Sequence, residues 1–272
     1  MPTTYLFVPG SRPDRFDKAV AGGADRVIVD LEDAVAPADK TMARQALGSW
    51  LAHLSDDVRA RLVVRINDAS SPWFAEDLEW LQGHAVHEVM LSKCESSAHI
   101  ACVHERMPSY GKVLPLIETV CGVLALSDIA KSPQVSRLAF GSIDYMHDLD
   151  VPEAGFAVDA AALSIAMASR AAELPPPVAG VTTELDAQCV KSDMAHARSL
   201  GFGAKMCIHP SQVTAVHEAL MPSLQAQAWA ARILEAWQSS KGAGAIQVDG
   251  KMVDKPVVLR AQRILDAVGV QS

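Results

Sequence analysis

Short apolar segments rich in β-branched residues recur along the first 210 residues of the chain, with longer mixed segments between them. Apolar runs of this kind are typical of buried parallel strands. Eight can be marked, at 5–8, 26–31, 62–66, 88–91, 113–117, 137–140, 178–182 and 205–208. Helical spacing of apolar positions predicts helices between them, at 12–21, 40–54, 74–81, 97–107, 120–127, 158–172 and 184–200.

Eight strands alternating with helices indicate an α/β fold of the (β/α)8 TIM barrel type. The competing fold is an open, doubly wound sheet, which usually carries a GxGxxG turn after its first strand. Here the first turn reads Pro9-Gly10-Ser11-Arg12-Pro13, which does not match that pattern. We therefore expect a closed barrel.

The alternation stops after Val213, and a different pattern closes the chain. The elements predicted there are a helix over 213–240 interrupted at Pro222, a flexible glycine-containing stretch over 241–245, a hairpin over 246–254 and a helix over 257–268. Segments joined to an enzyme core through a glycine-rich hinge often act as lids. We therefore expect the barrel over 1–220 and a C-terminal lid segment over 221–272.

Composition narrows the classes of partner. The 272 residues carry a formal net charge of −8, and no run of Lys and Arg offsets it, so nucleic acid and anionic membranes are poor partners. We find no stretch of 18 apolar residues and no basic leader, and we expect neither a membrane span nor a signal peptide. The five cysteines form no CxxC pair, which favours reduced thiols in a cytoplasmic protein.

Polar residues follow every predicted strand, at the end where barrel enzymes carry their chemistry. Those that bear on the argument are Arg12, Asp30, Glu32, Asp33, Arg65, Lys93, Glu118, Asp144, Thr182 and His209. Several carboxylates beside a few cations favour a hard divalent cation together with an anionic ligand.

Two of these carboxylates, Glu118 and Asp144, follow neighbouring strands. A pair that leaves room for waters and a chelating substrate suits Mg²⁺, but each acid could equally cap the next helix N-terminus. Arg65 could clamp a substrate carboxylate or a developing oxyanion, and it could also form a structural ion pair with Asp30.

Other polar residues give weaker signals. Lys93 could form a Schiff base with a carbonyl substrate, but nearby acids would raise its pKa and favour an ion-pair role. His84 and His87 form an HxxH pair without a third ligand. His209 could act as a base or hold its loop by a hydrogen bond.

Seven stretches carry a more specific pattern, in order across nearly the whole chain. They are LFVPGSRPDRFDKA (6–19), VIVDLEDAVAPADKTMAR (27–44), VVRIND (63–68), LPLIETVCGV (114–123), LAFGSIDYMHDL (138–149), GFGAKMCIHPSQV (201–213) and GKMVDKPVVLRAQRIL (250–265). These stretches resemble the citrate lyase β-subunit-like family, which includes malyl-CoA and citramalyl-CoA lyases.

The resemblance implies a Mg²⁺-dependent barrel enzyme, usually a homotrimer or a multiple of one. Such an enzyme cleaves a 3-hydroxyacyl-CoA thioester, such as citryl-, malyl- or citramalyl-CoA, to an oxo acid and an acyl-CoA. In this chain Glu118 and Asp144 match the metal ligands, and Glu118 is also expected to bind the substrate. Arg65 matches the arginine that binds the oxo-acid part.

The resemblance also implies contacts with coenzyme A and between subunits. Phe7, Arg12 and Lys18 fall at the spacing of residues that contact CoA in malyl-CoA lyases. Asp254 matches an acid delivered into the neighbouring subunit's active site, and it is our candidate for the catalytic general acid.

Side-chain alternation along the second strand suggests different roles for its acids. Asp30 and Glu32 share the inward face with Ile28, whereas Val27 and Val29 point toward the helices. We expect Asp30 to pair with Arg65, and Glu32 and Asp33 to hold water molecules bound to the metal.

Three alternatives remain open from the sequence. The chain could be a Mg²⁺-dependent aldolase for free hydroxy-oxo acids, which would need no CoA site. It could be a subunit of a citrate lyase complex that acts on an acyl-carrier-protein thioester. A thioesterase or a malate-synthase-like activity could use the same site, because hydrolysis requires only water there.

Overall fold

The computed structural model describes residues 1–240 and 244–269. The chain divides into two compact units, Met1–Ala219, here called the barrel unit, and Leu220–Ser272, here called the C-terminal unit. None of the helices formed by the described residues has the length and apolar character needed to cross a membrane.

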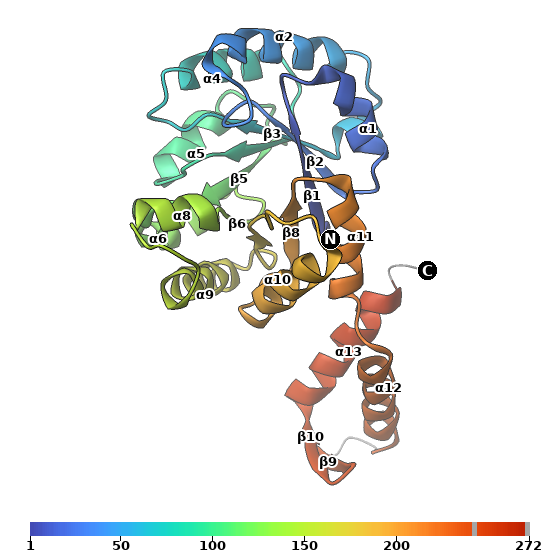
Figure 1. Ribbon diagram of the computed structural model, residues 1–272. Helices are drawn as coiled ribbons and strands as arrows, with labels where there is room; N and C mark the ends of the chain where they lie inside the picture. Colours follow the sequence, from blue (N-terminus) through green and yellow to red (C-terminus); the bar gives the residue numbers. More distant parts are fainter. Residues whose placement is uncertain (241–243, 270–272) are drawn as a thin grey trace. The chain divides into compact units, whose positions relative to one another are not determined.

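Eight parallel strands form a closed barrel in the barrel unit (Figure 1). They are β1 (Thr4–Pro9), β2 (Arg26–Asp30), β3 (Leu62–Ile66), β4 (Glu88–Leu91), β5 (Lys112–Ile117), β6 (Ala139–Phe140), β7 (Val178–Ala179) and β8 (Ala204–Cys207). Each strand pairs with the next in sequence, and β8 pairs with β1, with Tyr5 opposite Met206. The (β/α)8 barrel is confirmed, and the open doubly wound sheet is excluded.

Helices cover the outside of the barrel (Figure 1). They are η1 (Pro13–Arg15), α1 (Phe16–Ala21), η2 (Pro37–Asp39), α2 (Lys40–Leu51), α3 (Asp56–Arg59), α4 (Phe74–Gln82), α5 (Ser97–His104), α6 (Val120–Leu124), α7 (Leu126–Ala130), α8 (Ser142–Asp148), α9 (Phe156–Ala171), α10 (Ala187–Ser199) and α11 (Pro210–Leu220). The sequence pattern did not predict the short helices α3 and α8. The second of these is important because it carries a site residue.

The barrel interior is filled by one alternate set of strand side chains. Its buried members are Tyr5, Ile28, Val63, Met90, Leu114, Leu116, Ala139, Val178, Ala204 and Met206. Val27 and Val29, the neighbours of Ile28 in the chain, are also fully buried, which agrees with a strand enclosed on both faces. The strands therefore form a rigid frame whose carboxyl ends hold the polar residues that follow them.

The seventh strand is shorter than the predicted 178–182. Beyond Ala179, side chains rather than a neighbouring strand satisfy the backbone carbonyls. Lys205 Nζ donates to Gly180 O at 2.8 Å, and Gln212 Nε2 donates to Thr182 O at 2.9 Å. The apolar run continues past the point where the hydrogen-bonded ladder ends.

The C-terminal unit consists of α12 (Leu224–Ser239), β9 (Ala245–Val248), β10 (Lys251–Asp254) and α13 (Lys255–Gly269). The two strands form an antiparallel hairpin, and Asp249 and Gly250 at its turn have φ values of 51° and 75°. Two consecutive residues of positive φ are the mark of a tight hairpin turn. Of the predicted flexible stretch, residues 241–243 lie outside the described residues.

Candidate active site

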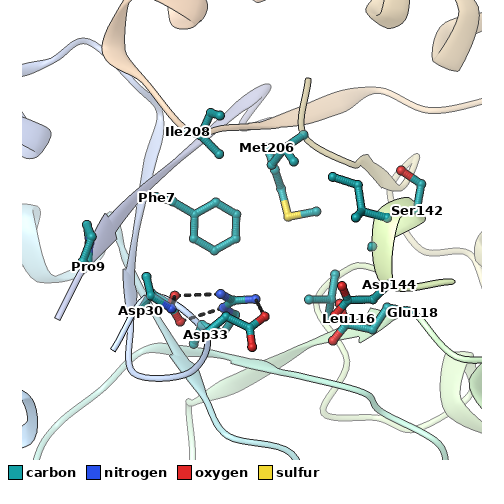
Figure 2. Close-up of a pocket in the computed structure, with 15 residues that line it drawn as sticks. Phe7, Pro9, Asp30, Asp33, Leu116, Glu118, Ser142, Asp144, Met206 and Ile208 are labelled. Carbon is teal, nitrogen blue, oxygen red and sulfur yellow. Dashed lines mark hydrogen bonds and ion pairs between the residues drawn. The ribbon is translucent and has the colours of Figure 1, made fainter. Parts of the chain in front are cut away.

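A pocket of about 440 Å³ lies at the carboxyl ends of the strands in the barrel unit. Figure 2 shows that its two sides differ: Asp30, Asp33, Glu118 and Asp144 lie on one side, and Phe7, Met206 and Ile208 lie on the other. Arg65 also lines it. We call the charged groups at this end of the barrel the mouth cluster; they are Asp30, Glu32, Asp33, Arg65, Lys93, Glu118 and Asp144.

Arg65, on the third strand, is held by Asp30 on the second. Its Nε and Nη2 atoms donate to Asp30 Oδ1 and Oδ2 at 2.7 Å each, a bidentate pair that fixes the guanidinium plane. Asp30 also accepts from the backbone N–H groups of Glu32 and Ala34, at 2.8 and 2.9 Å. The same carboxylate therefore orients the arginine and shapes the loop after β2.

Further contacts surround the same guanidinium. Its Nη1 atom lies 2.9 Å from Glu32 Oε2 and 3.7 Å from Asp33 Oδ2, and its Cζ atom lies 4.9 Å from the centre of the Phe7 ring. Burial alone would lower the pKa of Arg65, but the carboxylates of Asp30 and Glu32 outweigh burial and raise it. Arg65 is thus a permanent, preorganised cation at the edge of the pocket.

Glu118 follows the fifth strand and is almost fully buried, with 3% of its surface exposed. It accepts a hydrogen bond from the backbone N–H of Lys93 at 2.8 Å. Burial raises the pKa of Glu118 to about 8, and the negative charges of Glu32 and Asp144 add to the effect. The charged form of this carboxylate is therefore short of positive partners.

Gly141 makes the position of Glu118 possible. A Cβ atom at residue 141 would lie 2.7 Å from the Cβ atom of Glu118 and would also overlap its carboxylate. Any side chain there would displace Glu118 or the end of the sixth strand.

Asp144 lies in the first turn of α8 and not at the strand end itself, because the helix begins directly after Gly141. Its side chain is 39% exposed, and its Oδ2 atom is 3.6 Å from Lys93 Nζ. Asp144 and Glu118 line the same pocket (Figure 2), and the negative charge of Asp144 is near enough to raise the pKa of Glu118.

Lys93 connects the acids of the mouth cluster. Its ammonium donates to Glu32 Oε1 at 3.0 Å, while its backbone N–H holds Glu118. Its backbone adopts φ = 43°, a left-handed conformation that is strained for a residue other than glycine. Partial burial alone would lower the pKa of Lys93, but the hydrogen bond and charge of Glu32 raise it overall, which favours the ion-pair role over a Schiff base.

A second set of charges, the support cluster, lies beneath the loop that follows β2, and sequence reasoning did not find it. It consists of Lys40, Arg44, Asn67 and Asp77, each at most 5% exposed. Lys40 Nζ donates to the carbonyls of Leu31 and Glu32 and to Asn67 Oδ1, at 2.8 Å each.

Asp77 completes the support cluster. Its carboxylate accepts from Arg44 Nη1 at 2.8 Å and from the backbone and side chain of Asn67 at 2.9 and 2.6 Å. The cluster fixes the loop that carries Glu32 and Asp33. Lys40 and Arg44 are four residues apart and so share one face of α2, but nothing in the sequence indicates that this face is buried.

In the barrel unit, three predicted site residues are absent from the pocket lining: Glu32, which is buried within the mouth cluster, and Arg12 and Lys18. Arg12 and Lys18 are exposed, and Arg12 pairs with Asp14 at 2.8 Å. Asp254 belongs to the C-terminal unit, where its Oδ1 atom accepts from the backbone N–H of Val257 at 3.3 Å, in the first turn of α13.

The histidines also do not form a metal site. Within the described part of the chain, no group of three or more His, Cys, Asp or Glu side chains is arranged to hold a metal ion. His84 Nδ1 bonds to the Trp80 carbonyl at 2.7 Å, and His209 Nδ1 bonds to Ser211 Oγ at 2.8 Å. Glu118 and Asp144 could therefore hold a cation only with oxygens from water or substrate, which is a normal environment for Mg²⁺.

The fold and the site together define a (β/α)8-barrel enzyme with an acidic mouth built around one fixed arginine. The family model described as HpcH/HpaI aldolase/citrate lyase matches residues 3–210, and the chain belongs to this family, which makes it an enzyme of the lyase type. A citrate lyase subunit beta-like protein of Mycobacterium tuberculosis is 37% identical over 97% of this chain and 95% of its own length.

Two further proteins are similar to this chain, one in structure and one in sequence. The crystal structure of CitE from M. tuberculosis in complex with magnesium, acetoacetate and coenzyme A superposes with a TM-score of 0.88 at 35% identity, covering 98% of each chain. A (3S)-malyl-CoA thioesterase of Cereibacter sphaeroides is 29% identical over 96% of this chain and 93% of its own.

Proposed function

We propose that this protein is a Mg²⁺-dependent carbon–carbon lyase that cleaves a 3-hydroxyacyl-CoA thioester to an oxo acid and an acyl-CoA by a retro-Claisen reaction. The observation that carries the proposal is the pairing of Glu118 and Asp144 beside Arg65 in one pocket. The similarity to a CitE crystallised with magnesium, acetoacetate and coenzyme A supports it.

Glu118 and Asp144 would hold the metal. The raised pKa of Glu118 fits this role, because a buried carboxylate with one hydrogen bond gains most from a cation. When bound, Mg²⁺ would supply a Lewis acid to the substrate hydroxyl and carboxylate oxygens and so favour transfer of the hydroxyl proton to solvent water. We propose that Glu32 and Asp33 orient water molecules beside this site.

Arg65 would bind the oxo-acid part. Three of its donor positions are used by Asp30 and Glu32, and the remaining N–H groups can meet a substrate carboxylate. As the carbon–carbon bond breaks, its electron pair passes to the thioester side as an enolate. The hydroxyl oxygen becomes the carbonyl of the oxo acid, and Arg65 stabilises the charge on that side.

The enolate must then be protonated, and Asp254 is our candidate for the acid. We propose that it acts in the active site of a neighbouring subunit of a homotrimer, with residues 221–272 serving as the lid. Arg12 and Lys18 would contact the CoA part of the substrate, which is far larger than a 440 Å³ pocket, and Phe7 would contact it from within. The five unpaired cysteines favour a reducing, cytoplasmic setting.

One experiment tests the reaction. The purified protein is incubated with Mg²⁺ and with malyl-, citramalyl-, citryl- or 3-hydroxy-3-methylglutaryl-CoA, and free oxo acid and free CoA are measured separately. Oxo acid without free CoA, abolished by EDTA, is the expected result. Free CoA without oxo acid would identify a thioesterase, the activity of the C. sphaeroides relative.

A different substrate carrier is a second candidate, because a citrate lyase subunit beta of Leuconostoc mesenteroides is 31% identical over 96% of this chain. If no CoA ester is cleaved but an acyl-carrier-protein thioester is, this alternative replaces the first. Cleavage of free hydroxy-oxo acids, with unchanged KM after replacement of Arg12 and Lys18, would identify an aldolase.

Subunit mixing tests the lid. The variants Glu118→Ala and Asp254→Asn are each expected to be inactive alone and to recover part of the activity when they are unfolded together and reassembled. Recovery requires that one subunit's Asp254 serves another subunit's metal pair. Mixed oligomers that remain inactive would contradict delivery between subunits.

A further inference from the structure

We infer that the pocket selects a substrate whose third substituent on the carbinol carbon is uncharged and apolar, so that the enzyme releases pyruvate or a longer 2-oxoalkanoate in preference to oxaloacetate. This inference rests on the proposed function. It distinguishes three substrates that differ in one substituent on the carbinol carbon. The substituent is hydrogen in malyl-CoA, methyl in citramalyl-CoA and carboxymethyl in citryl-CoA.

The charged residues that line the pocket favour an uncharged substituent. Of the described residues that line the pocket, Arg65 is the one cation, and it faces the carboxylates Asp30, Asp33, Glu118 and Asp144. Lys93 lies outside the lining, and its ammonium is already shared between Glu32 and Asp144. Mg²⁺ and Arg65 together can serve the first substrate carboxylate and the hydroxyl.

A second substrate carboxylate has no such partner. The carboxymethyl group of citryl-CoA would have to lie near the four acids or enter the opposite side of the pocket. Beside the four acids a second carboxylate would be repelled, and on the opposite side it would exchange part of its hydration for apolar walls without a compensating charge.

The side of the pocket opposite the acids is apolar and favours an apolar substituent. Phe7 from β1, Val181 after β7, Met206 from β8 and Ile208 after β8 line the pocket with no cation and no carboxylate among them. Figure 2 shows Phe7, Met206 and Ile208 facing the pocket across from the acids. A methyl or ethyl group on the carbinol carbon is the substituent that such a surface stabilises.

Binding of the free oxo acids tests the inference without turnover. Titration calorimetry of the Mg²⁺-loaded protein is expected to give a Kd for pyruvate or 2-oxobutyrate about a hundredfold below that for oxaloacetate. In turnover, kcat/KM should rank citramalyl-CoA above malyl-CoA by about tenfold, and above citryl-CoA by on the order of a hundredfold.

Ile208 offers a way to reverse the preference. Its side chain lines the pocket, the residue is 43% exposed, and its backbone N–H donates to Gln212 Oε1 at 2.9 Å. Ile208→Arg adds the missing cation and is expected to raise the citryl-to-citramalyl ratio of kcat/KM at least tenfold. Ile208→Leu is the matched control and should leave the ratio unchanged.

The outcomes separate this inference from the function beneath it. If the wild type cleaves citryl-CoA as efficiently as citramalyl-CoA, or binds oxaloacetate as tightly as pyruvate, the inferred selectivity is wrong. The proposed lyase function is unaffected by that result. An unchanged ratio in a folded Ile208→Arg variant also overturns it. If no CoA ester is cleaved under any condition, the proposed function fails and the inference fails with it.

Discussion

The mouth cluster and the support cluster are both built from buried charges, but they differ in how fully those charges are paired. In the support cluster, Lys40 meets three acceptors, and Asp77 accepts from both Arg44 and Asn67. In the mouth cluster, five carboxylates share two cations. The first arrangement is complete in the protein alone, and the second requires a cation from outside.

This difference separates structural charges from functional ones. A buried charge whose hydrogen bonds are all made fixes one conformation, and its loss leaves a partner uncompensated. In the mouth cluster, burial raises the pKa of Glu118, and the negative charges of Glu32 and Asp144 raise it further, so the charged form is disfavoured until a cation binds. Such a site is retained in a protein because it binds a ligand, and not because it stabilises the fold.

The strongest test of the comparison is Glu118→Gln. We expect kcat to fall at least about a thousandfold, because the metal pair is reduced to one carboxylate and the Lewis acid is lost. The variant should fold as well as the wild type, since a neutral amide suits the buried position. Differential scanning calorimetry should show that Mg²⁺ raises the Tm of the wild type only. A variant that is active and stabilised by Mg²⁺ would mean that the metal lies elsewhere.

Asp77→Ala is expected to lower the stability of the protein more than its activity. It leaves Arg44 buried without its main partner, which costs about 3 kcal/mol in the free energy of unfolding by urea. The matched control is Glu76→Ala, which removes the other acid paired with Arg44, one that is 53% exposed. That control should cost at most about 1 kcal/mol. Equal losses in the two variants would remove the distinction between the clusters.

Arg65→Lys tests whether the fixed arginine serves substrate. A lysine cannot keep two hydrogen bonds to Asp30 and also present N–H groups to a carboxylate, so kcat/KM should fall about a hundredfold. Arg61, which precedes the same strand at its opposite end and donates to the carbonyls of Val20 and Ala24, provides the control. Arg61→Lys should retain activity. A fully active Arg65→Lys enzyme would assign the arginine to structure alone.

Lys93→Met gives the smallest and most specific effect. Removing the ammonium beside Asp144 and Glu32 removes repulsion of the metal, so titration calorimetry should show a Kd for Mg²⁺ lowered about tenfold. Lys93→Arg keeps the charge and should leave the Kd near the wild-type value. Weaker Mg²⁺ binding in Lys93→Met would show instead that the ammonium mainly holds the carboxylates in place.

The sequence allowed much of the barrel to be predicted, because buried parallel strands leave a local signal. Val27-Ile28-Val29 is readable as a strand without any knowledge of its neighbours, and the acids after it then fall at the mouth. The pairing of Asp30 with Arg65 followed from adjacent strands in register, where these two residues are opposite each other.

What the sequence could not provide depends on contacts between distant segments. Lys40 and Asp77 look like surface residues of two helices, and only the folded chain shows that both are buried and hydrogen-bonded to Asn67. The left-handed backbone of Lys93 has no glycine to indicate it. Arg12 and Lys18 were assigned to CoA by the family resemblance alone. Both are exposed and outside the pocket lining, Arg12 just before η1 and Lys18 on α1, and their contact with CoA stays a prediction.

The close approach of Gly141 to Glu118 has a consequence for how this site can change over generations. Because a side chain at 141 overlaps the carboxylate at 118, the two positions are not free to vary one at a time. Replacement of Gly141 even by alanine would displace the Glu118 carboxylate from its position in the pocket. Changes of substrate are therefore expected on the opposite wall, where Ile208 can be exchanged without disturbing Glu118 and Asp144.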